Sequence, residues 1–381
     1  MKPIKCIWID KNYDISLPMG KYTHCCKMPL MHIEPGYNAV TNPQTQRIKK
    51  QFAAGEQPPE CEFCWQDERA GLQSYRQRHL SIASTQATTH LQFQLPSYCQ
   101  GTCYYCTPAL STSIARYGSW LTGDARNLRS VDINNTHSVI TLQQQLDTLY
   151  SLPTDTSLNI GLVGGEPLLK DTVSDWLPEI IRAAKQHCDS VTLSVCTNSW
   201  TKLDVLDQFY NLVEQCQVPV NISISVENTG ARAEWVRGCD WQHLDRVASI
   251  HRQRCNILTL KPTENFLSVS NLPELIDWFA KIGFDFWDSG VVNQSILQTH
   301  SLPISYKKYY IRARKRISQF HNPVMRKHLN DMLNRIYRTL GTRSHNYHNA
   351  IHAAEKIDSI RGTDVHAAFP ELRKHRAPRQ P

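Results

Sequence analysis

Short apolar runs alternate with amphipathic helical stretches between about residues 90 and 292, and this alternation constrains the fold more than any other feature. Six runs have the pattern of strands, at 90–95, 158–163, 190–196, 218–226, 256–261 and 284–292. Helical patterns lie between them, near 140–150, 172–187, 203–215, 241–252 and 271–282. Such alternation indicates βαβ units around a parallel sheet. We therefore predict an α/β protein with a partial (β/α)6 TIM-like barrel, whose ligands bind at the C-terminal ends of the strands.

The segments on either side of this region differ from it in composition. Residues 1–85 are rich in Cys, Pro and Gly and have few periodic runs, which predicts a small, irregular Cys-rich module. Residues 301–381 have helical patterns at 304–320, 323–341 and 346–358, and they hold 17 Lys and Arg against 5 Asp and Glu. We expect three domains, namely the module at 1–85, the barrel at 86–300 and a basic helical C-terminal extension at 301–381.

The basic extension has two interpretations. It can be an electrostatic footprint for nucleic acid, or the solvated face of amphipathic helices. Its position after all six strands favours a role in engaging a partner or substrate. The chain has no run of about 18 apolar residues, so we expect no membrane span. The N-terminus turns polar too early for a signal peptide, which predicts a cytoplasmic protein.

Three cysteines follow the first predicted strand in the segment SYCQGTCYYC, as Cys99, Cys103 and Cys106. In a reducing cytosol such clusters bind metal more often than they form disulfides. Thiolates spaced Cys-x3-Cys-x2-Cys on one loop suit a soft metal centre, either iron–sulfur or zinc. A structural zinc site requires a fourth protein ligand, whereas an iron–sulfur cubane held by three cysteines leaves one iron open.

This loop, with Tyr105 just before its third cysteine, resembles that of the radical S-adenosylmethionine (SAM) superfamily. The resemblance implies that Cys99, Cys103 and Cys106 hold a [4Fe–4S] cluster. It also implies that the open iron chelates the amino and carboxylate groups of SAM.

Later segments resemble the same superfamily in the same order along the chain. Gly164, Gly165 and Glu166, followed by Pro167, match a Gly-Gly-Glu-Pro segment whose backbone meets the methionine amine of the cofactor; glycines permit that close approach. The remaining matches imply further cofactor contacts: Thr197-Asn198-Ser199 (where relatives have Thr-Asn-Gly), Ser225 and Glu227 at the ribose, and Glu234 with Arg237. Asn265 resembles another polar contact position, although a lone Asn is more often a turn residue.

A second group of cysteines lies in the N-terminal module. Cys6, Gly20 and Cys25 have the spacing Cys-x13-Gly-x4-Cys, and Cys61 and Cys64 follow. This resembles the auxiliary-cluster modules called SPASM and twitch, although in relatives such modules usually follow the barrel. The resemblance implies a second, auxiliary [4Fe–4S] cluster with four cysteine ligands. A four-cysteine zinc site has the same ligand count and stays an alternative.

Together these resemblances imply a radical SAM oxidoreductase or modifying enzyme. An electron donor such as flavodoxin or ferredoxin reduces it, SAM is cleaved to methionine and a 5′-deoxyadenosyl radical, and the radical abstracts hydrogen from a substrate. We expect a peptide or protein substrate. The alternatives are a nucleic-acid base or a group attached to one, and, from another class, a non-catalytic zinc protein that binds nucleic acid. The last alternative leaves the ordered Gly-Gly-Glu-Pro and Ser-x-Glu segments unexplained. No residue is assigned as a catalytic proton or hydrogen donor.

Overall fold

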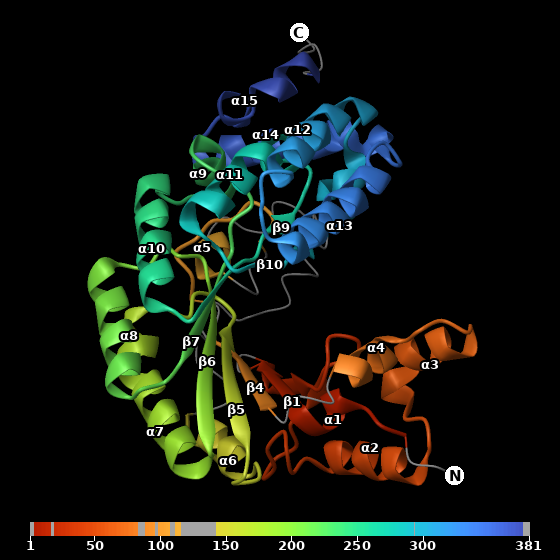
Figure 1. The fold of residues 1–381 in the computed structure, drawn as a ribbon, viewed down its shortest axis with the longest axis vertical. Coiled ribbons are helices and arrows are strands. Elements are labelled where there is room, and N and C mark those ends of the chain that lie inside the picture. Colours follow the sequence, from red (N-terminus) through yellow and green to blue (C-terminus); the bar gives the residue numbers. More distant parts are fainter. Residues whose placement is uncertain are drawn as a thin grey trace. The chain divides into compact units, whose positions relative to one another are not determined.

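The computed structural model describes residues 4–16, 19–82, 88–95, 98–106, 111–115, 142–292 and 294–375. The described residues form two compact units. The first comprises those up to residue 95, together with 142–195 and 204–220, and the second comprises the rest. Figure 1 shows the elements of both units along the chain.

The first unit contains most of a largely parallel sheet. Its strand order is β3-β2-β1-β4-β5-β6. The strands are β1 (Asn12–Ser16), β2 (Lys21–Thr23), β3 (Met31–His32), β4 (Thr88–Gln94), β5 (Ser157–Val163) and β6 (Ser190–Thr197). β4 pairs in parallel with both β1 and β5, and β5 with β6, whereas β2 and β3 are antiparallel additions beyond β1.

Strands β4, β5 and β6 have one apolar and one polar face. Their buried positions are mostly apolar, as at Leu91, Ile160 and Leu193, and the alternate positions are mostly half-buried and polar. Helices with long apolar stripes accompany them, and Figure 1 shows two of these beside β5 and β6. The helices are α6 (Leu142–Tyr150), α7 (Leu177–His187) and α8 (Leu203–Gln215).

The N-terminal segment is more regular than its composition predicts. Besides β1 to β3 it has the helices α1 (Ile7–Lys11), α2 (Pro43–Ala54), α3 (Glu62–Arg69) and α4 (Tyr75–Ile82). The expectation of an irregular module was wrong because β1 is only five residues long and gains its partner from β4, with Asn12 opposite His90 and Ser16 opposite Gln94. A short strand whose stability comes from a distant partner gives a weak local signal.

The second unit continues the β/α alternation. Its parallel strands are β7 (Val220–Ile224), β8 (Ile257–Leu260) and β10 (Phe286–Trp287), and a small parallel pair joins β9 (Thr263–Glu264) to β11 (Gly290–Val291). Its helices are α5 (Thr112–Ala115), α9 (Ala231–Arg237), α10 (Trp241–Arg254), α11 (Leu272–Ile282), α12 (Lys307–Ile317), α13 (Pro323–Thr339), α14 (Tyr347–Arg361) and α15 (Val365–Ala368).

The C-terminal helices are an integral part of the second unit. They bury apolar side chains such as Ile317 and Leu333. Trp235 on α9 donates to a carboxylate oxygen of Asp358 on α14 over 2.7 Å, and Arg335 on α13 pairs with the buried Glu264. Most of the basic side chains of this segment are exposed. The solvated-face interpretation therefore explains their burial pattern, and a role in partner binding stays a prediction.

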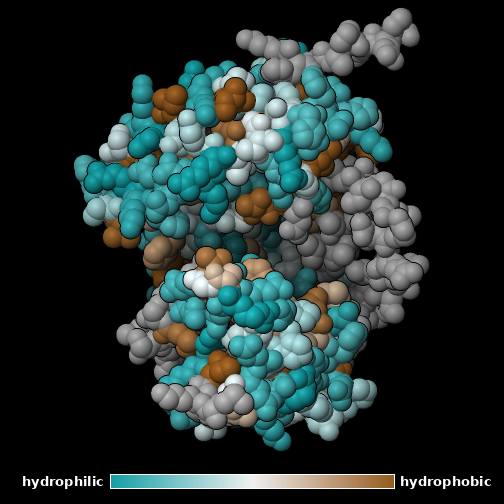
Figure 2. Space-filling view, turned by 90° about the vertical axis from the view of Figure 1, so that its right-hand side faces the viewer, coloured by the Kyte–Doolittle hydropathy of each residue, from teal (hydrophilic) through white to brown (hydrophobic). Residues whose placement is uncertain are grey.

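The predicted α/β class is confirmed. Mixed helices and strands form a largely parallel sheet, consistent with a partial (β/α)6 barrel, and the chain ends in helices. The sixth predicted strand is divided between β10 and β11. The division into domains at 85 and 300 stays a prediction. Among the described residues, none of the helices combines the length and apolar character that a bilayer crossing requires. Figure 2 shows one face of the surface, which is mostly hydrophilic with scattered apolar side chains.

Candidate functional site

The cysteine loop lies against the C-terminal end of helix α9. The backbone amide of Thr102 donates to the carbonyl oxygen of Arg237 over 3.0 Å, and that of Tyr104 donates to Val236 over 2.9 Å. Helix α9 ends at Gly238, whose backbone is left-handed with φ of 66°. These contacts fix the loop between Thr102 and Tyr104 and thereby the position of Cys103.

Nitrogen donors surround two of the three sulfurs of the loop. The Cys99 sulfur accepts from the Gly101 amide over 3.4 Å and from Asn198 Nδ2 over 3.5 Å. The Cys103 sulfur accepts from Arg237 Nη1 over 3.7 Å. A Cβ atom built on Gly101 would lie 3.4 Å from the Cys99 sulfur and 3.8 Å from the Cys103 sulfur, so both sulfurs lie close to one point beside the loop. Cys106 is half-buried, and its amide donates to the carbonyl of Cys103.

The donors at the Cys99 and Cys103 sulfurs fit thiolates that hold a cluster, and Cys106 as the third ligand stays a prediction. Hydrogen bonds to the sulfurs are among the features by which proteins set the reduction potential of iron–sulfur clusters. Burial raises the pKa of the Cys103 thiol, and the Arg237 guanidinium acts in the opposite direction. Within the part of the chain that the structure describes, no group of three or more His, Cys, Asp or Glu side chains is arranged to hold a single metal ion.

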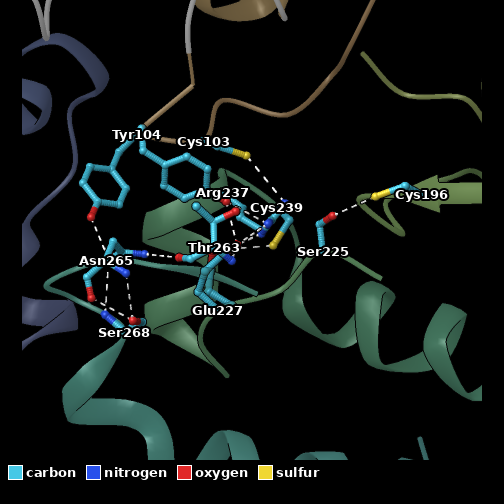
Figure 3. A network of polar contacts seen from close by, with 12 residues as sticks. Cys103, Tyr104, Cys196, Ser225, Glu227, Arg237, Cys239, Thr263, Asn265 and Ser268 are labelled. Atoms are coloured by element: carbon cyan, nitrogen blue, oxygen red, sulfur yellow. Dashed lines mark hydrogen bonds and ion pairs between the residues drawn. The ribbon is translucent and has the colours of Figure 1, made fainter. Parts of the chain in front are cut away.

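A buried ionic network lies next to Cys103 (Figure 3). Glu227 Oε2 accepts from Arg237 Nε over 2.8 Å, and Oε1 accepts from the Tyr105 hydroxyl over 2.6 Å and from the Thr263 amide over 3.1 Å. Arg237 Nη2 contacts Glu227 Oε1 and donates to the Tyr105 hydroxyl over 2.8 Å. Burial raises the pKa of Tyr105 well above its usual value, so its hydroxyl stays protonated.

The ends of β6 and β7 bring further predicted residues together. The Ser225 amide donates to the Thr197 carbonyl over 2.9 Å, and the Ser225 hydroxyl lies 3.5 Å from the Cys196 sulfur. Asn198, besides its contact to Cys99, accepts from the Trp200 amide over 2.8 Å. Thr197, Asn198, Ser225, Glu227 and Arg237 thus belong to the same unit as the cysteine loop.

Ser199 explains one departure from the pattern of relatives. Its φ is 55°, in the left-handed region that glycine adopts without strain. A glycine at this position, as in a Thr-Asn-Gly segment, would adopt the conformation without strain. Its backbone amide donates to Thr197 Oγ1 over 2.9 Å, which helps to hold that conformation.

The segment from Gly164 to Pro167 follows β5 in the first unit. Gly164 has a φ of 120°, and a Cβ atom there would lie 2.6 Å from the carbonyl oxygen of Leu95. This glycine is therefore required by the packing of its own backbone against the end of β4. Glu166 is buried, and one of its oxygens accepts from the Leu168 amide over 2.9 Å, which closes the turn after the strand.

The four N-terminal cysteines line one pocket. Cys6, Cys25, Cys61 and Cys64 lie in its lining, together with residues that include Trp8, Phe63 and Arg76. Burial raises the pKa of Cys6 to about 11 and also raises the pKa of Cys25 and of Cys61; at Cys61 the neighbouring thiols add to the effect. The four predicted residues thus share one pocket, and their binding of a metal centre stays a prediction.

Two features of the structure were not predicted. On the polar face of the first unit's sheet, Asn159 Nδ2 lies 3.1 Å from His90 Nδ1, and Ser194 donates to Asn159 Oδ1 over 2.8 Å. The period-two alternation of polar residues in the strands was the available signal. In the second unit, Tyr104 donates to Asn265 Oδ1 over 2.7 Å, and Asn265 also closes the turn that follows it.

No protein-family model and no curated relative matches the chain. Several solved structures are similar in part. Native anSMEcpe with bound AdoMet is 13% identical with a TM-score of 0.42, over 59% of this chain and 58% of that one. Streptococcus suis SuiB bound to the precursor peptide SuiA is 11% identical with a TM-score of 0.35, over 98% and 75%. TYW1 with a lysine-pyruvate adduct bound is 12% identical with a TM-score of 0.35, over 74% and 89%.

The chain spans about three fifths of the length of the anSMEcpe structures that it matches. With TM-scores below 0.5, these likenesses carry no argument about what the chain binds or does.

Proposed function

We propose that this chain is a radical SAM enzyme. The observation that carries the proposal is the cysteine loop, in which Cys99 and Cys103 accept hydrogen bonds from Gly101, Asn198 and Arg237. Cys99, Cys103 and Cys106 are the residues that would hold a [4Fe–4S] cluster. A cluster bound there supplies one electron for the reductive cleavage of SAM to methionine and a 5′-deoxyadenosyl radical.

The protein's own residues orient and insulate this site. The two backbone hydrogen bonds to helix α9 hold the loop, and Asn198 holds the Cys99 sulfur. Ser225, Thr197 and Asn198, at the ends of adjacent strands, supply hydroxyl and amide groups for a polar cofactor. We propose the backbone and glycines of Gly164 to Glu166 as a further contact to the methionine moiety, in line with the sequence resemblance.

The N-terminal cysteines support a second metal centre. Cys6, Cys25, Cys61 and Cys64 face one pocket, and we propose that they hold an auxiliary [4Fe–4S] cluster with no open iron. A zinc ion is the alternative occupant. Metal analysis of anaerobically purified protein separates the two, because stoichiometric zinc without iron in the module would contradict the auxiliary cluster.

We propose a peptide or protein as substrate. The support is the polar face with His90, Asn159 and Ser194, because a peptide backbone presents donors and acceptors that such side chains can bind. A nucleic-acid base or a group attached to one is the second candidate, supported by the exposed basic residues of α12 and α13. A flavodoxin or ferredoxin is the proposed electron donor, and the cytoplasm the proposed compartment.

Anaerobic reconstitution followed by electron paramagnetic resonance tests the proposal. We expect about eight irons per chain, and about four after Cys99, Cys103 and Cys106 are all replaced by Ala. With dithionite and SAM, wild type should form 5′-deoxyadenosine without substrate, and Cys99→Ala should form none. A fully loaded wild type that only methylates with SAM or only hydrolyses it would contradict the mechanism.

A further inference from the structure

The carboxylate of Glu227 is enclosed by protein donors. Its side chain has an exposed fraction of 0%, and it receives hydrogen bonds from Tyr105, Thr263 and both Nε and Nη2 of Arg237. The sequence resemblance implies that this carboxylate meets the ribose of SAM. A ribose hydroxyl could reach it only by displacing one of these buried donors, which would leave that donor without a partner at a substantial cost in free energy.

Arg237 is oriented by the same contacts. Guanidinium is planar, so binding Nε and Nη2 to Glu227 and Tyr105 also fixes the direction of Nη1. Nη1 lies 3.7 Å from the Cys103 sulfur, and the Arg237 side chain is only 6% exposed. Figure 3 shows Arg237 between Glu227 and Cys103. A permanent positive charge is therefore held beside one cluster-loop thiolate in a site with little access to water.

We infer that Arg237 is a positioning residue that raises the reduction potential of the cluster at this loop, and that Glu227 orients Arg237 instead of binding ribose. The inference rests on the proposed function, because it requires a cluster at Cys99, Cys103 and Cys106. Reduction adds one negative charge to a cluster, and a nearby cation stabilises the reduced form. Burial strengthens this effect because the interaction is poorly screened.

The test is a redox titration of anaerobically reconstituted full-length protein. The cluster at the cysteine loop is monitored by electron paramagnetic resonance, through the signal that changes when SAM is added. At a fixed solution potential, Arg237→Gln should lower the ratio of reduced to oxidised cluster about tenfold, which is a shift of about 59 mV for one electron. Glu227→Gln keeps one acceptor oxygen, replaces the other by an NH2 group and removes the negative charge, so the ratio should rise. The two substitutions act in opposite directions, which a merely structural role does not predict.

Arg232→Gln is the matched control. Arg232 lies on the same helix as Arg237, but its guanidinium pairs with Glu371 and contacts Ser270. Removing its charge should leave the ratio unchanged. Arg237→Gln can fail to fold because Glu227 is left buried without its partner. In that case a higher ratio of reduced to oxidised cluster in Glu227→Gln than in Arg232→Gln still supports the inference, and an equal ratio contradicts it.

Three outcomes are distinguishable. Equal potentials in wild type, Arg237→Gln and Glu227→Gln at equal iron content would overturn the inference. Weaker SAM binding by Glu227→Gln in equilibrium dialysis, without any shift in potential, would also overturn it and restore the ribose contact. A wild-type protein that binds no iron at the cysteine loop would instead contradict the proposed function.

Discussion

Gly238 leaves the space that the hydroxyl group of Thr102 occupies: a Cβ atom at position 238 would lie 2.0 Å from Thr102 Oγ1. Gly238 ends helix α9 with a φ of 66°, and Thr102 stands between the first two cysteines of the loop, where its amide donates to Arg237. The end of one helix and the cysteine loop are therefore fitted to each other at a single glycine.

Replacing this glycine should loosen the loop. Gly238→Ala adds a left-handed alanine, which costs about 1 kcal/mol, and a steric conflict with Thr102 of similar or greater size. Thr102→Ala removes the hydroxyl, so the double variant should recover about 1 kcal/mol of the loss. Urea unfolding of the four proteins measures this coupling, and iron content reports on the loop. Strictly additive changes in the free energy of unfolding would show that the two residues do not meet.

We expect the substitution Ser199→Gly to stabilise the protein. Ser199 has a φ of 55°, and its hydroxyl is buried without a hydrogen-bond partner among the described residues. Ser199→Gly relieves both costs, so we expect a gain of about 1 kcal/mol in the free energy of unfolding. Ser199→Ala removes the hydroxyl but keeps the backbone strain, and it should gain less. Thermal or urea unfolding measures the difference, and a glycine variant no more stable than the alanine variant would contradict the strain.

The sequence predicted the strands well and the N-terminal segment poorly, for one physical reason. The predicted strand at 158–163 matches β5 to within one residue because its apolar side chains alternate over a long run. Strand β1, in contrast, is stabilised by its pairing with β4, some 75 residues later in the chain. The sequence around β1 carries no signal of that pairing. The resemblance to auxiliary-cluster modules grouped Cys6, Cys25, Cys61 and Cys64. These residues line one pocket, and their role as metal ligands stays a prediction.

Sequence comparison selected residues of the candidate site but did not predict which of them contact one another. Motif matching selected Glu227 and Arg237 for the cofactor, and the structure pairs them with each other and with Tyr105. The contact to Tyr105 depends on how the cysteine loop packs against helix α9, more than a hundred residues later, which the sequence does not encode in any short window. The contact between His90 and Asn159 was missed because it joins two strands, β4 and β5, whose pairing register no short window of sequence gives.

We expect the free energy of unfolding to decrease in acid because of His251. His251 is fully buried on helix α10, and burial lowers its pKa from 6.5 to about 3. Between pH 6.5 and 3 the unfolded chain binds a proton at this residue and the folded chain does not. The contribution of His251 to stability is therefore complete above pH 6.5 and decreases by about 1.4 kcal/mol for each pH unit below it. Below about pH 3 both states are protonated and the decrease ends.

The measurement is urea unfolding at pH 7.5, 6.0 and 5.0 for wild type and His251→Gln. Glutamine does not titrate, so the difference in the free energy of unfolding between the two proteins should change with pH while the contributions of all other groups cancel. Wild type should lose about 2 kcal/mol relative to His251→Gln between pH 7.5 and 5.0. A difference that stays constant would mean that His251 has an ordinary pKa in the folded protein.

The exposed face of helix α12 predicts salt-dependent binding of a polyanion. Arg312, Arg314, Lys315 and Arg316 are all exposed, while Tyr310, Ala313 and Ile317 form the buried side of the same helix. Arg316 lies 3.4 Å from a carboxylate oxygen of Asp277, and the pair is half-exposed. Replacing the four basic residues with Gln removes their charge and the contacts of Arg314 with the Tyr310 hydroxyl and of Arg316 with Asp277. It leaves the apolar side of the helix unchanged, so the fold should stay intact.

Filter binding to a single-stranded oligonucleotide at two salt concentrations tests this surface. The quadruple variant should bind more weakly, mainly at low salt, because each lost phosphate contact lowers the dependence of log K on log salt by about 0.7 to 0.9. The control replaces four other exposed basic residues of the C-terminal segment with Gln: Arg338, Arg343, Lys356 and Arg373. Formation of 5′-deoxyadenosine without substrate should be unchanged. Unaltered oligonucleotide binding together with a lower melting temperature would assign the α12 residues a structural role only.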